Sequence, residues 1–265
     1  MTFVSIAAGL LVGYLLMVMG RRGRTEPLQG WSYAHRGLHN DACSENSLTA
    51  FRRARDHGYG IEFDVHLLKD GSLAILHDSD LRRVTGQAGL LEELTAKDLG
   101  SYRLKGTKDT IPTFRQVLEC YQGKAPLIIE LKVHGNNYAA LCRQVCRELE
   151  GYSGVFCLES FDPRCVFWLR RHRPELIRGQ LTENYFRSTS KLPWVLKWIM
   201  TWQMTNFLTM PDFVAYKVQD RKHFSNRLVR SLWHVQGVTW TVQDEKTYEN
   251  VLKEGWIPIF EGFNP

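Results

Sequence analysis

The sequence lacks several patterns that would indicate a function directly. Its six cysteines include no C-x-x-C pair and no zinc-ribbon spacing, and unpatterned thiols of this kind are typical of a reducing compartment. No G-x-G-x-x-G or G-x-x-x-x-G-K pattern is present to indicate a nucleotide-binding loop. Blocks of like charge are also missing, and with a net charge of only +6 the chain is not expected to bind nucleic acid.

A long apolar run stands at the start of the chain. Residues 3–19 carry no charge and are rich in Leu, Val and Met. A helix of about 19 residues at ~1.5 Å per residue reaches roughly 29 Å, close to the hydrocarbon thickness of a bilayer. Because the basic residues follow this run, we expect an uncleaved transmembrane anchor over residues 1–20 and not a signal peptide.

The segment after the anchor carries positive charge. Arg21, Arg22 and Arg24 lie in a short linker that we assign to residues 21–30. The positive-inside rule then predicts a single-pass protein of the cell membrane, with the rest of the chain on the cytoplasmic side.

Beyond the linker, short β-type runs alternate with helical patterns. Eight strand–helix units in about 235 residues fit a TIM (β/α)8 barrel, which typically needs ~250 residues, and an open doubly wound sheet is the alternative. We assign residues 31–265 to this one domain, with a small insertion at about 79–111 after the second strand. The expected strands are residues 31–35, 61–65, 127–131, 155–158, 177–181, 213–216, 238–242 and 257–260.

One hairpin, residues 61–78, concentrates polar side chains. Glu62 and Asp64 stand two apart and therefore share one face of a strand. A turn at residues 70–71, Asp-Gly, predicts a two-residue type I′ hairpin, in which both central residues have positive φ. In that register Asp64 would face His77 on the returning strand.

Other expected strands also end in polar residues. In a TIM barrel the C-terminal strand ends meet at one face, and reactive groups gather there. Glu130 and Lys132, again two apart, close the third strand. The residues expected at this face are His35, Arg36, Glu62, Asp64, Glu130, Lys132 and Glu159.

The acidic members of this set indicate a metal ion. Glu62, Asp64 and Glu130 would repel one another in one barrel mouth unless a cation neutralised them. Oxygen ligands without cysteine favour Mg²⁺ or Ca²⁺, while zinc is the alternative that the carboxylate majority disfavours. Arg36 and Lys132 add positive charge beside the ion, and that combination suits a phosphate group.

Two histidines, His35 and His77, complete the set. They form a natural general acid and general base near neutral pH. We expect His66 and the remaining histidines to take no part in catalysis. Together with a metal and two basic side chains, the pair predicts metal-assisted cleavage of a phosphate ester.

An ordered series of motifs supports this interpretation. The motifs are His35-Arg36-Gly37, Glu45-Asn46, Glu62-x-Asp64, Lys69-Asp70-Gly71, His77-Asp78, Ile111-Pro112-Thr113 and Glu130-x-Lys132. From about residue 31 to the C-terminus the chain thereby resembles the glycerophosphodiester phosphodiesterase family, in a membrane-anchored bacterial form. The resemblance implies a TIM barrel with a small subdomain after the second strand, a divalent metal and two catalytic histidines.

The resemblance also implies a role for each residue of the motifs. The catalytic pair is His35 and His77, the metal ligands are Glu62, Asp64 and Glu130, the phosphate contacts are Arg36 and Lys132, and the supporting residues are Glu45 and Asn46. The chain departs from the family at Ser44, where proline is usual. It also departs near its C-terminus, where the family has an aspartate, and this leaves open whether Glu261 takes that place.

The implied reaction is hydrolysis of glycerophosphodiesters, with lysophospholipids as a further substrate class. The products would be glycerol 3-phosphate or another phosphomonoester, and an alcohol. The alternatives are phospholipase D-type cleavage that releases a cyclic phosphate, and a non-catalytic module that binds lipid headgroups. A Trp-rich apolar segment, residues 192–208, is expected either to lie in the membrane interface or to pack on the barrel as an extra helix.

Overall fold

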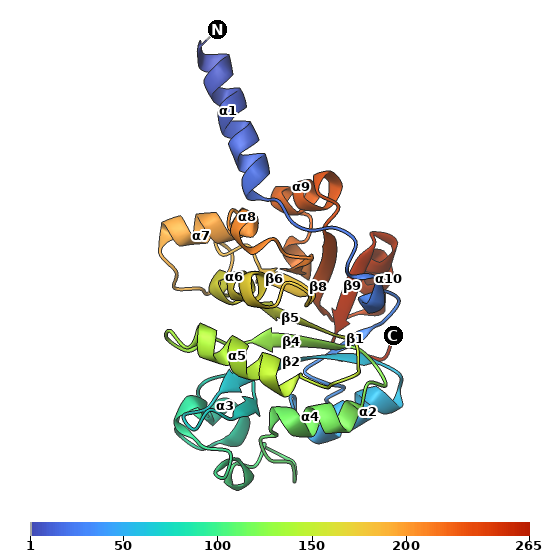
Figure 1. Cartoon of the computed structure of the whole chain (residues 1–265). Coiled ribbons are helices and arrows are strands. Elements are labelled where there is room, and N and C mark those ends of the chain that lie inside the picture. Colours follow the sequence, from blue (N-terminus) through green and yellow to red (C-terminus); the bar gives the residue numbers. More distant parts are fainter. Residues whose placement is uncertain (1) are drawn as a thin grey trace.

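The chain forms a closed barrel of parallel strands surrounded by helices (Figure 1). The computed structural model describes residues 2–265. Eight strands pair in the order β1-β2-β4-β5-β6-β7-β8-β9, and β9 pairs with β1 to close the ring. A ninth strand, β3, pairs antiparallel with the end of β2. The predicted TIM barrel is confirmed, and the open sheet is wrong because both edges of the sheet are joined.

The elements alternate along the chain as the sequence pattern predicted. The strands are β1 (Tyr33–His35), β2 (Gly60–Leu67), β3 (Leu73–Ile75), β4 (Leu127–Leu131), β5 (Phe156–Ser160), β6 (Arg178–Thr182), β7 (Phe213–Lys217), β8 (Gln236–Val242) and β9 (Trp256–Phe260). The helices are α1 (Thr2–Met17), α2 (Leu48–Asp56), α3 (Arg82–Thr85), α4 (Phe114–Tyr121), α5 (Tyr138–Glu148), α6 (Pro163–His172), α7 (Trp194–Thr201), α8 (Asn206–Thr209), α9 (Phe224–Leu232) and α10 (Glu245–Lys253).

The barrel interior is filled by apolar side chains below its mouth. Ile128, Phe213 and Val238 belong to this interior cluster and are fully buried. Close packing there depends on a glycine, since a Cβ at Gly179 would lie 2.1 Å from the Phe213 ring. A filled interior gives the strand ends a rigid base, and the reactive side chains stand on it.

The β2–β3 hairpin forms, but its predicted register is wrong by one residue. Val65 pairs with Ile75, which places Leu76, not His77, opposite Asp64. Leu76 N donates to Asp64 O over 3.3 Å in agreement with this pairing. His77 therefore lies one residue beyond the position that the sequence pattern predicted.

The register differs because the turn is longer than two residues. The loop spans residues 68–72, and only Gly71 in it has positive φ, at +85°. Asp70 instead accepts hydrogen bonds through its carboxylate from Ser72 N and Ala96 N. The aspartate caps the loop and ties it to the insertion, so a type I′ turn does not form.

The N-terminal helix is shorter than the predicted anchor. α1 has 16 residues, which at ~1.5 Å each span roughly 24 Å. Its last turn packs on the barrel domain, where Trp233 Nε1 donates to Leu15 O over 3.0 Å. None of the helices within residues 2–265 is long and apolar enough to cross a membrane. The anchor predicted over residues 1–20 is therefore not supported, and its first residue, Met1, lies outside the described part.

The first insertion, residues 79–111, folds as a small unit beside the barrel mouth. Its own apolar cluster includes Leu81, Val84, Leu91 and Leu99, all of them buried. The insertion is therefore a packed structure that can hold a side chain in a fixed position, rather than a loose loop.

Candidate active site

The strand register sets acidic side chains next to one another at the barrel mouth. Asp64 on β2 pairs with Glu130 on β4, and Glu130 pairs with Glu159 on β5. Glu62 lies two residues before Asp64 and pairs with His35 on β1. Because alternate residues of a strand share a face, parallel pairing alone brings these five side chains together.

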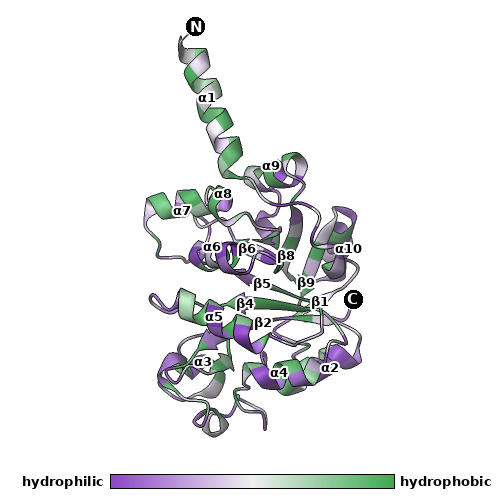
Figure 2. Cartoon of the chain, viewed as in Figure 1, coloured by the Kyte–Doolittle hydropathy of each residue, from purple (hydrophilic) through white to green (hydrophobic). Residues whose placement is uncertain are grey.

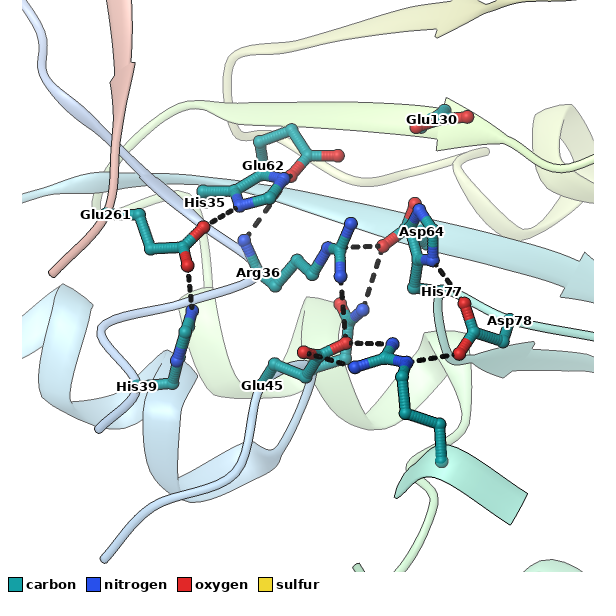
Figure 3. A network of polar contacts seen from close by, with 12 residues as sticks. His35, Arg36, His39, Glu45, Glu62, Asp64, His77, Asp78, Glu130 and Glu261 are labelled. Atoms are coloured by element: carbon teal, nitrogen blue, oxygen red, sulfur yellow. Dashed lines mark hydrogen bonds and ion pairs between the residues drawn. The ribbon is translucent and has the colours of Figure 1, made fainter. Parts of the chain in front are cut away.

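The three predicted metal ligands form one compact group (Figure 3). Glu62, Asp64 and Glu130 are buried, and each offers a carboxylate oxygen within 4.8 Å of the other two. Burial, together with the neighbouring carboxylates, raises the pKa of Glu62 well above its usual range and raises the pKa of Glu130 too. Both acids are thus held where their negative charge is disfavoured.

Asp64 differs from the other two acids. Burial would raise its pKa, but the positive charges of Lys132 and Arg36 outweigh burial and lower the pKa of Asp64. Asp64 Oδ1 is buried and accepts no hydrogen bond from the described residues. Apart from its ion pair with Lys132, this oxygen has no partner in the described part of the chain, and it lies beside two further buried carboxylates. The residues present therefore suit a divalent cation.

The two predicted phosphate contacts lie at the site, and both already touch carboxylates. Lys132 Nζ is 3.0 Å from Glu130 Oε1 and 3.3 Å from Asp64 Oδ1. Arg36 Nε is 3.5 Å from Asp64 Oδ2, and its Nη1 donates to Glu45 Oε1 over 2.9 Å. Their positive charges therefore lie beside the acids, at the edge of the predicted metal site.

The loop after β1 carries two residues in the left-handed region. Arg36 and Asn46 both have φ of +54°, and Asn46 N donates to Arg36 O over 2.8 Å. This conformation costs a non-glycine residue about 1–2 kcal/mol. The arrangement turns both side chains toward the same group, since Asn46 Nδ2 donates to Asp64 Oδ2 over 2.8 Å. Asn46 thus lies where support for the site was predicted.

Each predicted catalytic histidine is held by a carboxylate through Nδ1. His35 Nδ1 lies 2.5 Å from Glu261 Oε2, and His77 Nδ1 lies 2.6 Å from Asp78 Oδ1 (Figure 3). An ionised carboxylate only accepts, so Nδ1 donates in both pairs and Nε2 is left for the site. His35 Nε2 is 3.9 Å from Glu62 Oε2. Burial, opposed by the charge of Asp64, lowers the pKa of His77 to about 4.

Arg83 is a site residue that sequence reasoning missed. It comes from the first insertion, forms a hydrogen-bonded ion pair with Asp78, and donates to both oxygens of Glu45 over 2.7 and 2.9 Å. Burial opposes ionisation of Glu45, yet Arg83 and Arg36 lower the pKa of Glu45 to about 2. Asp78 is close to Arg83 in the sequence, but no motif includes Arg83, and its other partner, Glu45, is 38 residues away.

The sequence left open whether Glu261 takes the place of the family's aspartate, and the structure shows where its carboxylate lies. It follows β9, the neighbour of β1, and its carboxylate reaches both His35 and, at 3.9 Å, His39. The hydrogen bond from His35 lowers the pKa of Glu261. Glu261 therefore occupies the position of a carboxylate partner for the first histidine.

Most of the predicted catalytic and metal-ligating residues line one small cavity of about 150 Å³. Its walls are formed by His35, Arg36, Glu62, His77, Glu130, Glu159, Phe161, Leu181, Trp240 and Ile259. Phe161 packs edge-on against Trp240, with their ring centroids 5.6 Å apart. Trp240 Nε1 is buried there and has no hydrogen-bond partner among the described residues. The cavity thus combines ionisable groups on one side with aromatic rings on another.

A family model described as the glycerophosphoryl diester phosphodiesterase family matches residues 35–260, a span that contains every predicted catalytic and metal-ligating residue. The chain belongs to this family. The family resemblance identified from the motifs is confirmed, and the predicted enzyme class, phosphoric diester hydrolase, is confirmed with it. The membrane-anchored form is not shown.

Curated relatives carry the same family name. A glycerophosphodiester phosphodiesterase of Bacillus altitudinis is 34% identical over 113 residues, which are 40% of this chain and 46% of that protein. Glycerophosphodiester phosphodiesterase 1 of Mus musculus is 28% identical over 255 residues, 84% of this chain and 76% of that protein. The chain thus spans less than half of the first relative and about three quarters of the second.

Solved structures share the fold. An Oleispira antarctica phosphodiesterase in complex with the product sn-glycerol-3-phosphate has a TM-score of 0.73 at 21% identity, covering 87% of this chain and 92% of that one. A glycerophosphodiester phosphodiesterase from Parabacteroides distasonis has a TM-score of 0.69 at 22% identity, covering 87% and 92%. At 21% and 22% identity, these two structures show only that the barrel fold is shared.

Proposed function

We propose that this chain hydrolyses glycerophosphodiesters to glycerol 3-phosphate, or another phosphomonoester, and an alcohol. The observation that carries the proposal is a cavity lined by two carboxylate-bound histidines and by Glu62 and Glu130, which belong with Asp64 to one group of three buried acids. The complex of the Oleispira phosphodiesterase with sn-glycerol-3-phosphate supports this class of product.

In this proposal the histidines move the protons. Asp78 and Glu261 fix the Nδ1 atoms of His77 and His35, so each Nε2 can hold or release a proton at the reacting phosphodiester. One imidazole takes a proton from the water that attacks phosphorus. As the P–O bond to the leaving group breaks, the other imidazole gives a proton to the departing oxygen, which leaves as the alcohol. The two rings line the same cavity, as a paired acid and base require.

The charged groups of the site would bind the phosphate, the acids through a divalent cation and the basic side chains directly. Glu62, Asp64 and Glu130 would hold the divalent cation, Mg²⁺ or Ca²⁺, and that ion would stabilise negative charge on the phosphoryl oxygens. Arg36 and Lys132 would add contacts to the same oxygens, with Arg36 able to make two parallel hydrogen bonds.

An assay of the purified chain tests the proposal. With Mg²⁺ or Ca²⁺ we expect glycerophosphodiesters to give a phosphomonoester, detected by phosphorus NMR, and chelation should stop the reaction. His35→Ala and His77→Ala should each lower kcat about 10²- to 10⁴-fold, whereas the exposed control His57→Ala should not.

Three other results would contradict or replace part of the proposal. Wild-type rates in either histidine variant would contradict the acid/base roles. A cyclic phosphate as the final product would replace hydrolysis by phospholipase D-type cleavage. Binding without turnover under any metal would favour a headgroup-binding module and contradict the enzymatic proposal.

The proposal extends to lysophospholipids and to a lipid surface. A lysophospholipid presents the same reacting phosphodiester with an acyl chain added, and α7 exposes Trp194 (70%) and Trp198 (41%) at the end of the molecule where α1 lies (Figure 2). Aromatic side chains of this kind favour the membrane interface. Flotation with anionic vesicles tests this, and Trp194→Ser with Trp198→Ser should lower the bound fraction without slowing turnover of soluble substrate. The location at the cell membrane, on its cytoplasmic side, stays a prediction.

A further inference from the structure

A second cavity lies beside the catalytic one. Its volume is about 610 Å³, within the range of about 300–1,000 Å³ that is usual for small-molecule sites. One wall comes from the loop after β5, and the other comes from the second insertion, residues 183–212. The apolar contributors are Phe161, Pro163, Tyr185, Leu192, Leu196 and Met200.

The two cavities share Phe161 as a lining residue. This side chain lines the catalytic cavity together with His35 and Glu130, and it also lines the apolar cavity. The next residue, Asp162, lines the apolar cavity and the cleft that contains His77. A molecule held by its phosphodiester at the histidines would reach the apolar cavity by passing Phe161.

Charged groups of the apolar cavity are already paired within the chain. Arg164 donates to both oxygens of Asp162 over 3.0 and 2.6 Å, and Glu183 lies 3.4 Å from Lys217 Nζ. These pairs leave apolar atoms as the main surface offered to a ligand. An uncharged, flexible apolar group fits such a cavity, and an ionic ligand would have to break existing pairs.

We propose that this cavity binds the acyl chain of a lysophospholipid whose phosphodiester occupies the catalytic cavity. The inference rests on the proposed hydrolysis of glycerophosphodiesters and adds the part of the site that selects the substrate. Two residues of α7, Leu196 and Met200, line the cavity, although Leu196 is itself 44% exposed. Trp194 and Val195 are more exposed and do not line it.

The chain-length dependence of kcat/KM tests the inference. The substrates are a glycerophosphodiester without an acyl chain and the same compound with acyl chains of increasing length, all short enough to remain monomeric in water. Each methylene buried in the cavity should raise kcat/KM about threefold to fourfold until the cavity is filled. Monomeric substrates separate a cavity in the protein from attraction to a lipid surface.

Matched variants on α7 locate the effect. Leu196→Gln makes the cavity wall polar and Leu196→Trp fills the cavity, and both should flatten the dependence on chain length. Val195→Gln changes the neighbouring residue, which is 56% exposed and does not line the cavity, and it should keep the wild-type slope. All three variants should hydrolyse the compound without an acyl chain at wild-type rates, and this also shows that they fold.

The outcomes separate the two proposals. If the wild type cleaves the compound without a chain but gains nothing from added methylenes, the acyl-chain site is wrong and the proposed hydrolysis stands. If neither compound is cleaved under any divalent metal, the proposed function fails and the acyl-chain site fails with it. A slope that survives both Leu196 variants, or that is lost equally in Val195→Gln, would overturn the assignment to this cavity.

Discussion

The two insertions that interrupt the barrel reach its mouth with opposite chemistry. The first, residues 79–111, places the charged Arg83 on Asp78 and Glu45, the carboxylates that hold His77 and Arg36. The second, residues 183–212, places apolar side chains beside the same mouth. Changes in the first insertion should therefore slow every substrate, whereas changes in the second should alter only the choice among substrates.

The largest effect should come from the barrel itself, on which both insertions depend. Glu62→Gln removes one of the three predicted metal ligands and should lower turnover of all substrates by at least about 100-fold. Because burial disfavours the charge of Glu62, the amide should not lower the Tm of the metal-free protein. The metal-induced rise in Tm should disappear.

Thermal unfolding with and without Mg²⁺ or Ca²⁺ measures this, and Glu249→Gln on the exposed face of α10 is the control. A variant that keeps the metal-induced rise would show that the ion binds elsewhere. In that case the barrel mouth would not be the metal site, and the comparison of the two insertions beside it would lose its reference point.

The next effect should come from the two carboxylates that hold the histidines. Asp78→Asn and Glu261→Gln keep the shape of each side chain but remove the charged acceptor, and each should lower kcat about 10- to 100-fold, less than loss of the imidazole. The two variants also show which histidine depends on the first insertion, because Arg83 from that insertion contacts Asp78 and not Glu261. Steady-state kinetics of the double variants with Arg83→Met should show coupling for Asp78 and additivity for Glu261.

A smaller effect is expected at Arg83 alone. Arg83→Met should lower kcat about three- to tenfold on every substrate, since it loosens His77 and Arg36 indirectly and its side chain is half exposed. The exposed neighbour Arg82→Met is the control. If Arg83→Met changed the preference for acyl-chain length and left kcat intact, the contrast between the two insertions would be wrong.

The sequence could predict the barrel because its signals are local. The apolar run at residues 127–131 coincides with β4, and the polar residues that close the strands meet at the mouth because parallel pairing brings them there. The hairpin register could not be predicted from Asp70-Gly71 alone. The carboxylate of Asp70 caps the turn from the side, and that hydrogen bond depends on where residue 96 lies in the fold.

Two further features were beyond the sequence for the same reason. The last turn of α1 accepts a hydrogen bond from Trp233, which is more than 200 residues away, and hydropathy does not report such a contact. Arg83 reaches Glu45 only after the insertion has folded against the barrel. The motifs thus named the residues that meet at the site, including Glu45 and Asn46, whereas Arg83 belongs to no motif.

The smallest effect should be a pH dependence of stability at Glu45. Its pKa in the folded chain is about 2, below the ~4.3 of an unfolded chain, so its ion pairs with Arg36 and Arg83 stabilise the fold above about pH 4 and are lost as the pH falls toward 2. Glu45→Gln should therefore lower Tm by a few degrees at neutral pH and hardly at all near pH 2. Calorimetry across this range, with the exposed Glu93→Gln as control, measures it. A Tm difference that does not change with pH would contradict the ion-pair origin.

The left-handed backbone at Arg36 has a consequence for how this protein can change over evolutionary time. Glycine would adopt φ of +54° without the steric cost, so Arg36→Gly should be more stable than Arg36→Ala by about 1 kcal/mol. Both variants lose the guanidinium that touches Asp64 and Glu45. Once the guanidinium is lost, the backbone therefore favours glycine over alanine at this position. The arginine is retained at a steric cost that its contacts with Asp64 and Glu45 must offset.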